Sequence, residues 1–452
     1  MPPCAYPAGG GVQGGVQWTG NHGAMINAAT GTMDGWYDPA VANATWDDDR
    51  DPATPEVPWP EVQKRYATDV RRIDAAVGDL VQLLKDLHLD ENTLVVFTSD
   101  NGPSRESYLK GRPYDPTFFS GYGDFTGIKR DTLEGGEREP TLARWPGTVP
   151  AGRLDRTPGG LWDWLATFAD VAGVPAPAAS DGVSLVPALT GRGKQRPSNI
   201  YVEYFNNTRT PEYTPFTPVH RNRVRQQMQT VQVDGYVGVR YDIKSATDDF
   251  EIYDVEKDPA QARNLAADPA LASVQTRMKA RVLQMRRPES SAKRPYDEAL
   301  VPAAPPATLR EGRIAYGVYE GDWPWVPEFR NLRPAKEGTT EAINSAVCAA
   351  TKGGGAAFTG YFHAATDGDY TFFVASDGGA TLFLHDARVI DDDFARTGAQ
   401  VSGTIRLAAG WHPLRLYYRH ANGESRLAFE YSGPSIARRA IRPSELAWSV
   451  PQ

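Results

Sequence analysis

The chain has 452 residues, of which 40% are hydrophobic and 23% are charged, so it is long enough for two or three globular domains. Its formal net charge of −8 gives no basic excess to attract nucleic acid. There is no apolar run of about 18 residues, so no membrane span is expected. The two cysteines exclude a disulfide framework but leave a single bridge open, and the N-terminus lacks the charged start and apolar stretch of a signal peptide.

The first 195 residues are predicted to form loops followed by an α/β region. Residues 1–60 are rich in Gly, Asn, Asp and Pro without a sustained period, which predicts long surface loops. From Pro60 to Leu87 apolar residues recur every three or four positions, which predicts an amphipathic helix. The apolar run Leu94–Phe97 predicts a strand buried on both faces. Residues 61–195 are therefore assigned to an α/β part.

Two oxygen-bearing side chains follow that predicted strand directly. Asp100 and Asn101 stand in the segment Ser99-Asp100-Asn101-Gly102. Ligands gather beyond the carboxyl ends of strands in α/β folds, and a carboxylate with an amide oxygen suits Ca²⁺ or Mg²⁺. The pattern predicts half of a metal site. A plain turn is the other interpretation, because Asn-Gly after an apolar run is also typical of hairpins.

The next segments are predicted to form an aromatic loop, a helix and a small sheet. Residues 103–126 carry aromatic side chains among Pro and Gly, and these rings either shape a pocket or cap the core. A second amphipathic helix is predicted near 161–171 and is ended by Gly173. A small antiparallel sheet with a hairpin at Asp234-Gly235, and then a helix, are predicted at 200–205, 228–233, 236–241 and 272–286.

The character of the sequence changes near residue 295. Pro and Ala are interleaved from 295 to 308, which predicts a stiff extended linker. Short alternating segments separated by turn residues then predict an all-β sandwich. They lie at 359–362, 368–374, 380–384, 403–407, 412–418 and 426–431. The predicted domains are 1–300, with a small-sheet part at 196–300, a linker at 301–312, and 313–452.

Four motifs between residues 99 and 265 together resemble the sulfatase family, the arylsulfatase-like branch of the alkaline phosphatase superfamily. They are Ser99-Asp100-Asn101-Gly102, Gly127-Ile128-Lys129 leading into Glu134-Gly135-Gly136-Glu137-Arg138-Glu139-Pro140, Trp145-Pro146-Gly147, and Glu251–Pro259 with Asn264-Leu265. The resemblance implies a mixed sheet flanked by helices with a small antiparallel subdomain. It also implies a sulfuric ester hydrolase, periplasmic or extracellular, that acts on sulfated glycans, such as sulfated polysaccharides, or on aryl sulfates.

The resemblance carries over to individual residues of a metal and sulfate site. It implies that Asp100 and Asn101 bind Ca²⁺ (or Mg²⁺) and that Lys129 binds the sulfate group. Glu134 is expected to position the turn by hydrogen bonding, and Arg138 to pair with a carboxylate beneath the site.

A basic cluster at 218–225 contains His220 and Arg221. It is interpreted either as lining the mouth of the substrate pocket or as a surface patch.

The family's nucleophile is missing from this sequence. It is a formylglycine made from a Cys/Ser-x-Pro-x-Arg motif, whereas Cys4 precedes Ala-Tyr-Pro-Ala and Cys348 precedes Ala-Ala-Thr-Lys. The family's N-terminal Asp pair and Pro-His element are also absent, and His22 is expected to be an exposed loop residue. We therefore expect a truncated sulfatase domain that is inactive as written.

Two other functions stay open. One is a non-catalytic carbohydrate-associated binding protein on a degenerate sulfatase scaffold. The other is a phosphoesterase of the same superfamily.

The region after residue 313 resembles the PA14-type β-sandwich, through Gly368–Phe372, Ser376–Leu382 and Leu407–His412. In sugar-binding members a consecutive Asp pair holds Ca²⁺, whereas here Gly378 follows Asp377. We expect a structural or substrate-presenting appendage, with Asp391-Asp392-Asp393 in a solvated turn.

Overall fold

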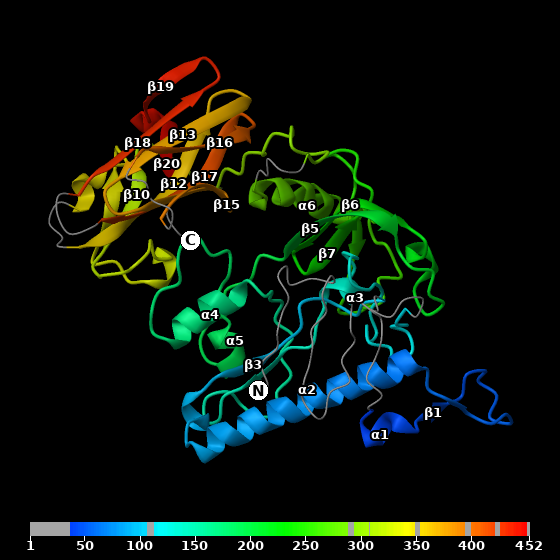
Figure 1. Ribbon diagram of the computed structural model, residues 1–452. Coiled ribbons are helices and arrows are strands. Elements are labelled where there is room, and N and C mark those ends of the chain that lie inside the picture. The colour runs from blue at the N-terminus through cyan, green and yellow to red at the C-terminus, as the bar shows by residue number, and fades with distance from the viewer. Residues whose placement is uncertain are drawn as a thin grey trace. The chain divides into compact units, whose positions relative to one another are not determined.

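The computed structural model describes residues 37–105, 113–287, 293–306, 308–348, 353–393, 399–420 and 425–449. The chain divides into two compact units, and Figure 1 shows its helices and strands with their labels. Unit 1 comprises residues 1–153, 209–223 and 258–262, and unit 2 comprises 154–208, 224–257 and 263–452. The predictions for residues 1–36, His22 and Cys4 among them, lie outside the described residues. None of the helices in the described ranges has the length and apolar character needed to cross a membrane.

Unit 1 is built around one long helix and a pair of short strands. The predicted helix is confirmed as α2 (Glu61–Asp86), with Pro60 at its N-cap. The predicted strand is confirmed as β3 (Val95–Phe97), which pairs antiparallel with β4 (Leu142–Arg144). The remaining elements are α1 (Pro39–Ala42), β1 (Thr45–Trp46), β2 (Val57–Pro58), η1 (Asp90–Asn92), α3 (Glu134–Glu137) and η2 (Pro218–His220).

Apolar side chains around α2 and β3 are not covered within the described part of the chain. Ile73 and Leu80 on α2 are 50% and 58% exposed, and Leu142 on β4 is 66% exposed. The three residues of β3 are only partly buried. The prediction of a strand buried on both faces is therefore wrong for the described residues, because what packs on the β3–β4 pair leaves each β3 side chain partly exposed.

Unit 2 contains the small antiparallel sheet expected from the sequence. The strand order is β5-β6-β7-β8, and the buried side chains of α6 share a hydrophobic core with the sheet. Asp234 and Gly235 in the β6–β7 turn both have positive φ, 53° and 82°, as a two-residue hairpin with a right-handed twist requires. The elements are α4 (Asp163–Val171), α5 (Val186–Thr190), β5 (Tyr201–Arg209), β6 (Val224–Val233), β7 (Tyr236–Arg240), β8 (Glu251–Tyr253), η3 (Pro269–Leu271) and α6 (Ala272–Met285).

The rest of unit 2 is an all-β antiparallel region of two sheets. One sheet has the order β11-β10-β12-β17-β14-β15, with β20 paired to β12 and β9 paired to β20, and the other has the order β16-β13-β18-β19. The six predicted strands are confirmed as β12, β13, β14, β16, β17 and β18. The elements are β9 (Arg310–Glu311), β10 (Ile314–Tyr319), η4 (Phe329–Asn331), β11 (Lys336–Thr340), η5 (Ser345–Cys348), β12 (Gly354–Ala364), β13 (Gly368–Ser376), β14 (Ala380–Leu384), β15 (Ala387–Asp392), β16 (Val401–Leu407), β17 (Gly410–His420), β18 (Leu427–Gly433), β19 (Ile436–Ala440), η6 (Pro443–Glu445) and β20 (Leu446–Trp448).

Aromatic rings from both sheets fill the centre of this sandwich. Phe362 on β12 lies 5.2 Å from Phe372 on β13 and 5.0 Å from Tyr431 on β18, measured between ring centroids. All three side chains are buried. Edge-to-face contacts of this kind add to the hydrophobic contribution of the buried ring area.

The segment predicted as a linker is extended, and it is hydrogen-bonded to the sandwich. The Val301 N–H donates to the Arg406 carbonyl at 2.8 Å, and the Ala408 N–H donates to the Val301 carbonyl at 3.0 Å. The Ala304 N–H donates to the Trp411 carbonyl at 3.0 Å. These bonds hold the segment along β16 and β17. The domain boundaries at 300 and 313 stay a prediction.

The acidic run at the end of β15 differs from its prediction. Asp392 and Asp393 are buried. The Ser376 hydroxyl donates to Asp392 Oδ2 at 2.9 Å, and the Val326 N–H donates to Asp393 Oδ2 at 2.8 Å. The predicted solvated turn is wrong for these two residues, because their carboxylates hold neighbouring segments of the sandwich.

Candidate functional site

The segment after β3 and the glycine-rich loop before α3 are in direct contact in unit 1. The Gly102 N–H donates to the Gly136 carbonyl at 3.0 Å, and the Lys129 N–H donates to the Pro103 carbonyl at 2.9 Å. A Cβ on Gly102 would lie 2.0 Å from the Gly135 carbonyl oxygen, so only glycine fits there. The structure therefore brings the Asp-Asn-Gly motif and the Glu-Gly-Gly motif together.

Lys129 lies in a tight turn closed by a buried carboxylate. The Ile128 N–H donates to Asp131 Oδ2 at 3.0 Å, and the Asp131 N–H donates to the Ile128 carbonyl at 2.9 Å. Lys129 is partly exposed, and no hydrogen bond or ion pair joins its ammonium group to another described residue. The turn is thus fixed by its neighbours, while the ammonium group is available to an anionic ligand.

Asp100 and Asn101 present oxygens beside this turn. Asp100 is exposed, and its carboxylate has no hydrogen bond or ion pair with the described residues. Asn101 Nδ2 donates to the Gly102 carbonyl at 2.8 Å, which leaves its Oδ1 as the remaining polar atom of the side chain. Burial raises the pKa of the Glu139 carboxyl, and the charge of Asp100 raises that pKa further. Glu139 was not singled out from the sequence, and its nearness to Asp100 creates a like-charge repulsion that a cation would relieve.

The oxygens of Asp100 and Asn101 can be compared with the ligands that Ca²⁺ or Mg²⁺ requires. Carboxylate and amide oxygens are the ligands these cations prefer, and a full shell takes about six to eight of them. Within the described ranges no group of three or more His, Cys, Asp and Glu side chains is arranged to hold a metal. Asp100 and Asn101 therefore carry oxygens of the kind that such a cation prefers, and they would make up only part of a full shell.

Glu134 and Arg138, four residues apart, form an ion pair. Arg138 Nε donates to Glu134 Oε2, and the guanidinium group lies 5.1 Å from the centroid of the Phe125 ring. Glu134 is buried, and its N–H donates to Gln261 Oε1 at 2.9 Å. Glu134 thus connects the glycine turn to Gln261.

Gln261 also holds the segment that contains His220 and Arg221. His220 is buried, and its Nε2 donates to the Gln261 carbonyl at 2.8 Å. Arg221 donates from Nε and Nη2 to the Phe216 carbonyl, at 2.8 and 2.6 Å. Both side chains therefore contribute to the structure of unit 1, and a role in substrate binding stays a prediction. Gln261 itself was missed, although it follows the Asp258-Pro259 motif closely in the sequence.

The rings of the aromatic loop contact one another and also rings on β1, on α2 and next to β2. Phe118 lies 4.7 Å from both Trp46 and Phe119, and Tyr66 of α2 lies 4.6 Å from Tyr114, all between ring centroids. Of the two interpretations, these contacts favour rings that cap the core, in the described part of the loop.

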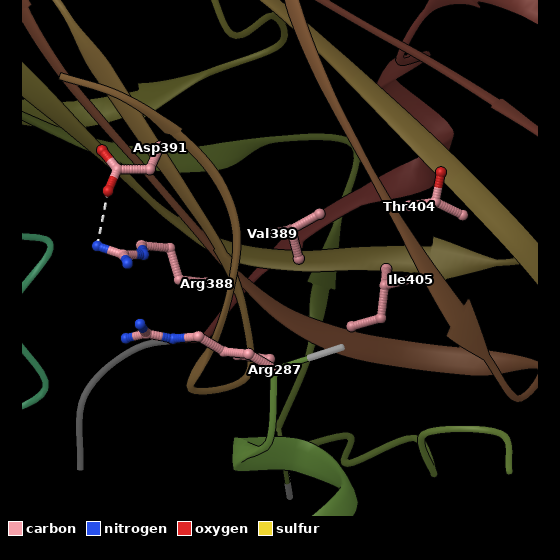
Figure 2. A pocket seen from close by; sticks show the side chains of 7 residues that line it. Arg287, Arg388, Val389, Asp391, Thr404 and Ile405 are labelled. Carbon is pink, nitrogen blue, oxygen red and sulfur yellow. Dashed lines mark ion pairs between the residues drawn. The ribbon is translucent and has the colours of Figure 1, made fainter. Parts of the chain in front are cut away.

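A separate pocket of about 290 Å³ lies in unit 2 (Figure 2). Figure 2 shows the guanidinium groups of Arg287 and Arg388 on the same side of it. Arg388 Nη1 pairs with Asp391 Oδ2 at 2.7 Å, and Arg287 pairs with Asp181. Both positive charges are thus balanced, and no predicted site residue lines this pocket.

Three family models match the chain in an order that agrees with the two regions predicted from the sequence. Their descriptions are "Sulfatase" for residues 17–174, "N-sulphoglucosamine sulphohydrolase, C-terminal" for residues 123–288, and "PA14 domain" for residues 354–445. The chain carries a partial sulfatase domain over residues 17–288, followed by a PA14 domain. Both resemblances stated from the sequence motifs are thereby confirmed.

Curated relatives of the sulfatase domain match over a limited length. N-acetylgalactosamine-6-sulfatase of Canis lupus familiaris is 42% identical over 129 residues, which is 28% of this chain and 23% of that protein. Arylsulfatase A of Homo sapiens is 38% identical over 141 residues, 30% of this chain and 25% of that protein. The chain thus spans about a quarter of the length of these relatives.

Among solved structures, one of BT4656 in complex with its substrate D-glucosamine-2-N,6-O-disulfate matches with a TM-score of 0.33 and 23% identity. The match covers 48% of this chain and 38% of that chain.

Proposed function

We propose that this chain is part of a sulfuric ester hydrolase of the arylsulfatase type, in which it holds the cation and lines the sulfate site. The observation that carries the proposal is the junction in unit 1. There the backbone bonds Gly102 to Gly136 and Pro103 to Lys129 fix the Asp100-Asn101 pair next to the Lys129 turn. The Asp-Asn-Gly motif and the Gly-x-Lys motif, which are separate in the sequence, thus lie in contact. We infer that together they form one site for a cation and a sulfate group.

The residues of the junction suit a sulfate ester. Such an ester carries negative charge that spreads over its oxygens in the transition state, and fixed positive charges lower the barrier. The Lys129 ammonium group supplies one such charge. A Ca²⁺ or Mg²⁺ ion held by Asp100 and Asn101 would supply the larger one as a Lewis acid. Glu134 and Arg138 keep the turn in place.

The proposed substrates are sulfated glycans, including sulfated polysaccharides, or aryl sulfates. Support comes from the relatives, whose names describe sulfatases of an aminosugar and of aryl esters. We propose a periplasmic or extracellular location on the same family resemblance. The PA14 domain is proposed to be a structural or substrate-presenting appendage.

The 452-residue chain alone is expected to show no turnover of 4-nitrophenyl sulfate above the buffer rate, with or without Ca²⁺. The physical reason is that no Cys/Ser-x-Pro-x-Arg motif is present in these residues to supply the nucleophile. The release of 4-nitrophenol is followed by absorbance, with a formylglycine-containing arylsulfatase as the positive control. Turnover by the parent chain that is lost in Lys129→Met would contradict the claim that the chain lacks a nucleophile. It would at the same time support Lys129 as part of the sulfate site.

A second candidate is a non-catalytic carbohydrate-binding protein on a degenerate sulfatase scaffold, favoured by the same missing motif. The two candidates differ in the DNA upstream of the Met1 codon. An in-frame Cys/Ser-x-Pro-x-Arg sequence there supports the enzyme, and an in-frame stop codon without one supports the binding protein.

A further inference from the structure

Helix α6 and the β-sandwich of unit 2 share one hydrophobic core. Val282 and Leu283 of α6 belong to the same cluster of buried side chains as Leu384, Ala387 and Ile405 of the sandwich. Such a shared core is typical of parts that stay together, because separation would expose apolar surface to water. The position of the sandwich on α6 is therefore set by specific contacts.

The β14–β15 turn, formed by His385 and Asp386, makes polar contacts with α6. The Asp386 N–H donates to the Gln284 carbonyl at 3.1 Å, one of the carbonyls in the last turn of α6 that has no partner within the helix. Asp386 Oδ2 pairs with Arg281 Nη1 of α6 at 2.6 Å, and Asp386 Oδ1 pairs with Arg415 Nη2 of β17 at 3.1 Å. One carboxylate thus links a helix and a strand through two guanidinium groups.

A buried pair of imidazole rings holds this turn from the sandwich side. His385 is 5% exposed and His412 is fully buried. His412 Nε2 lies 2.8 Å from the Ala408 carbonyl, which only accepts, so this nitrogen carries the proton. His412 Nδ1 is then the acceptor for His385 Nε2–H, at 2.9 Å. The backbone N–H of His385 also donates to the Pro413 carbonyl at 2.8 Å.

In this arrangement of protons His412 is neutral, because a proton added to its Nδ1 would face the proton on His385 Nε2. The charged groups around His385 are His412 and Arg415 on β17, Arg281 on α6, and Asp386 beside it, and His363 on β12 faces His412. Among these only Asp386 favours a positive charge on His385. Burial first, and then repulsion from Arg281, Arg415 and any proton on His412, lower the pKa of His385 to about 3, and burial lowers the pKa of His412.

We propose that the β14–β15 turn is an acid-sensitive latch that fixes the sandwich to the end of α6. The neutral histidine pair holds the turn, and the turn holds Asp386 against Arg281. Burial alone would raise the pKa of Asp386, but Arg281 and Arg415 keep it below its usual value, so the carboxylate stays charged in mild acid. The histidines, and not Asp386, therefore set the response between pH 7 and pH 5.

The direction of the response follows from the lowered pKa values. An opened turn takes up protons at the ordinary histidine pKa of 6.5, while the closed turn resists until about pH 3. The closed form is fully favoured above pH 6.5, and the preference is lost as the pH falls toward 3. For His385 alone, the ratio of closed to open forms drops by about 25-fold between pH 7 and pH 5.

Hydrogen exchange of the full chain, read by mass spectrometry on peptides covering residues 278–287 and 380–390, tests the latch. Exchange rates are corrected for their intrinsic pH dependence. Protection of both peptides is expected to fall at least tenfold from pH 7 to pH 5. In the double variant His385→Gln/His412→Gln, the new glutamine side chains do not titrate, so the loss of protection between pH 7 and pH 5 is expected to disappear. The control variant His88→Gln changes an exposed histidine and should behave like the parent chain.

Equal protection of the parent chain at both pH values would overturn the proposal, as would an unchanged fall in the double variant. Asp386→Asn gives a second test if the double variant does not fold. It removes the charge that Arg281 and Arg415 hold, so protection is expected to be at least tenfold lower already at pH 7. Parent-like protection of Asp386→Asn at pH 7 would also overturn the latch.

Discussion

Phe362→Ala is expected to lower the free energy of unfolding of unit 2 by about 3–5 kcal/mol, the range for a phenylalanine removed from a well-packed core. Phe362 is fully buried, and its ring contacts those of Tyr370, Phe372 and Tyr431 from the other sheet of the sandwich. These rings come from two neighbouring strands of that sheet, β13 and β18, so the cavity has no single neighbour that can close it. Urea unfolding followed by circular dichroism measures the change.

Phe205→Ala is the matched control for that substitution. Phe205 lies on β5 in the same unit and is 60% exposed, so its loss is expected to change the free energy of unfolding by less than about 0.5 kcal/mol. A cost for Phe362→Ala as small as that of the control would contradict the sandwich core.

Gly135→Ala is expected to destabilise unit 1 by about 3 kcal/mol, at the upper end of the usual cost of overpacking. The added Cβ would lie 2.5 Å from the Gly127 carbonyl oxygen and 2.8 Å from that of Thr126. Both are backbone atoms, so the loop must move, and the hydrogen bond from the Gly135 N–H to the Thr126 carbonyl is strained. The unfolding midpoint in urea measures the effect.

Gly78→Ala is the control for the same chemical change. Gly78 lies within α2, and a Cβ there would meet nothing within 4 Å. Alanine favours a helix interior over glycine by about 0.5–1 kcal/mol, so this variant is expected to be as stable as the parent chain or more stable. Equal effects of the two substitutions would mean that the glycine junction is not close-packed.

Local sequence patterns predicted the elements that have a clear hydrophobic period or a typical turn sequence. The period of α2 and the Asp234-Gly235 turn between β6 and β7 are examples, because each depends on residues near in sequence. β11 and β19 were missed, because both carry charged, largely exposed side chains without an apolar face. The pairing of β3 with β4 was also missed, since it joins residues about fifty positions apart and leaves no local signal.

The candidate site shows the same division between local and distant information. The spacing of the motifs predicted Asp100, Asn101 and Lys129 as site residues. The close backbone contacts between their loops depend on glycines that the same motifs contain. Gln261 was not found, because its contacts with Glu134 and His220 are made across more than forty residues of sequence each. Physical contact between distant segments is set by the packing of the whole unit.

Calcium binding by the chain tests the central claim, that Asp100 and Asn101 form part of a cation site, most directly. Isothermal titration with Ca²⁺, and then with Mg²⁺, is made on the parent chain, on Asp100→Asn and on the control Asp124→Asn, which changes an exposed carboxylate of the same unit. The account predicts that Asp100→Asn weakens binding about tenfold or more, because one charged ligand is lost, while Asp124→Asn binds like the parent chain. Equal affinity of the parent chain and Asp100→Asn would contradict it.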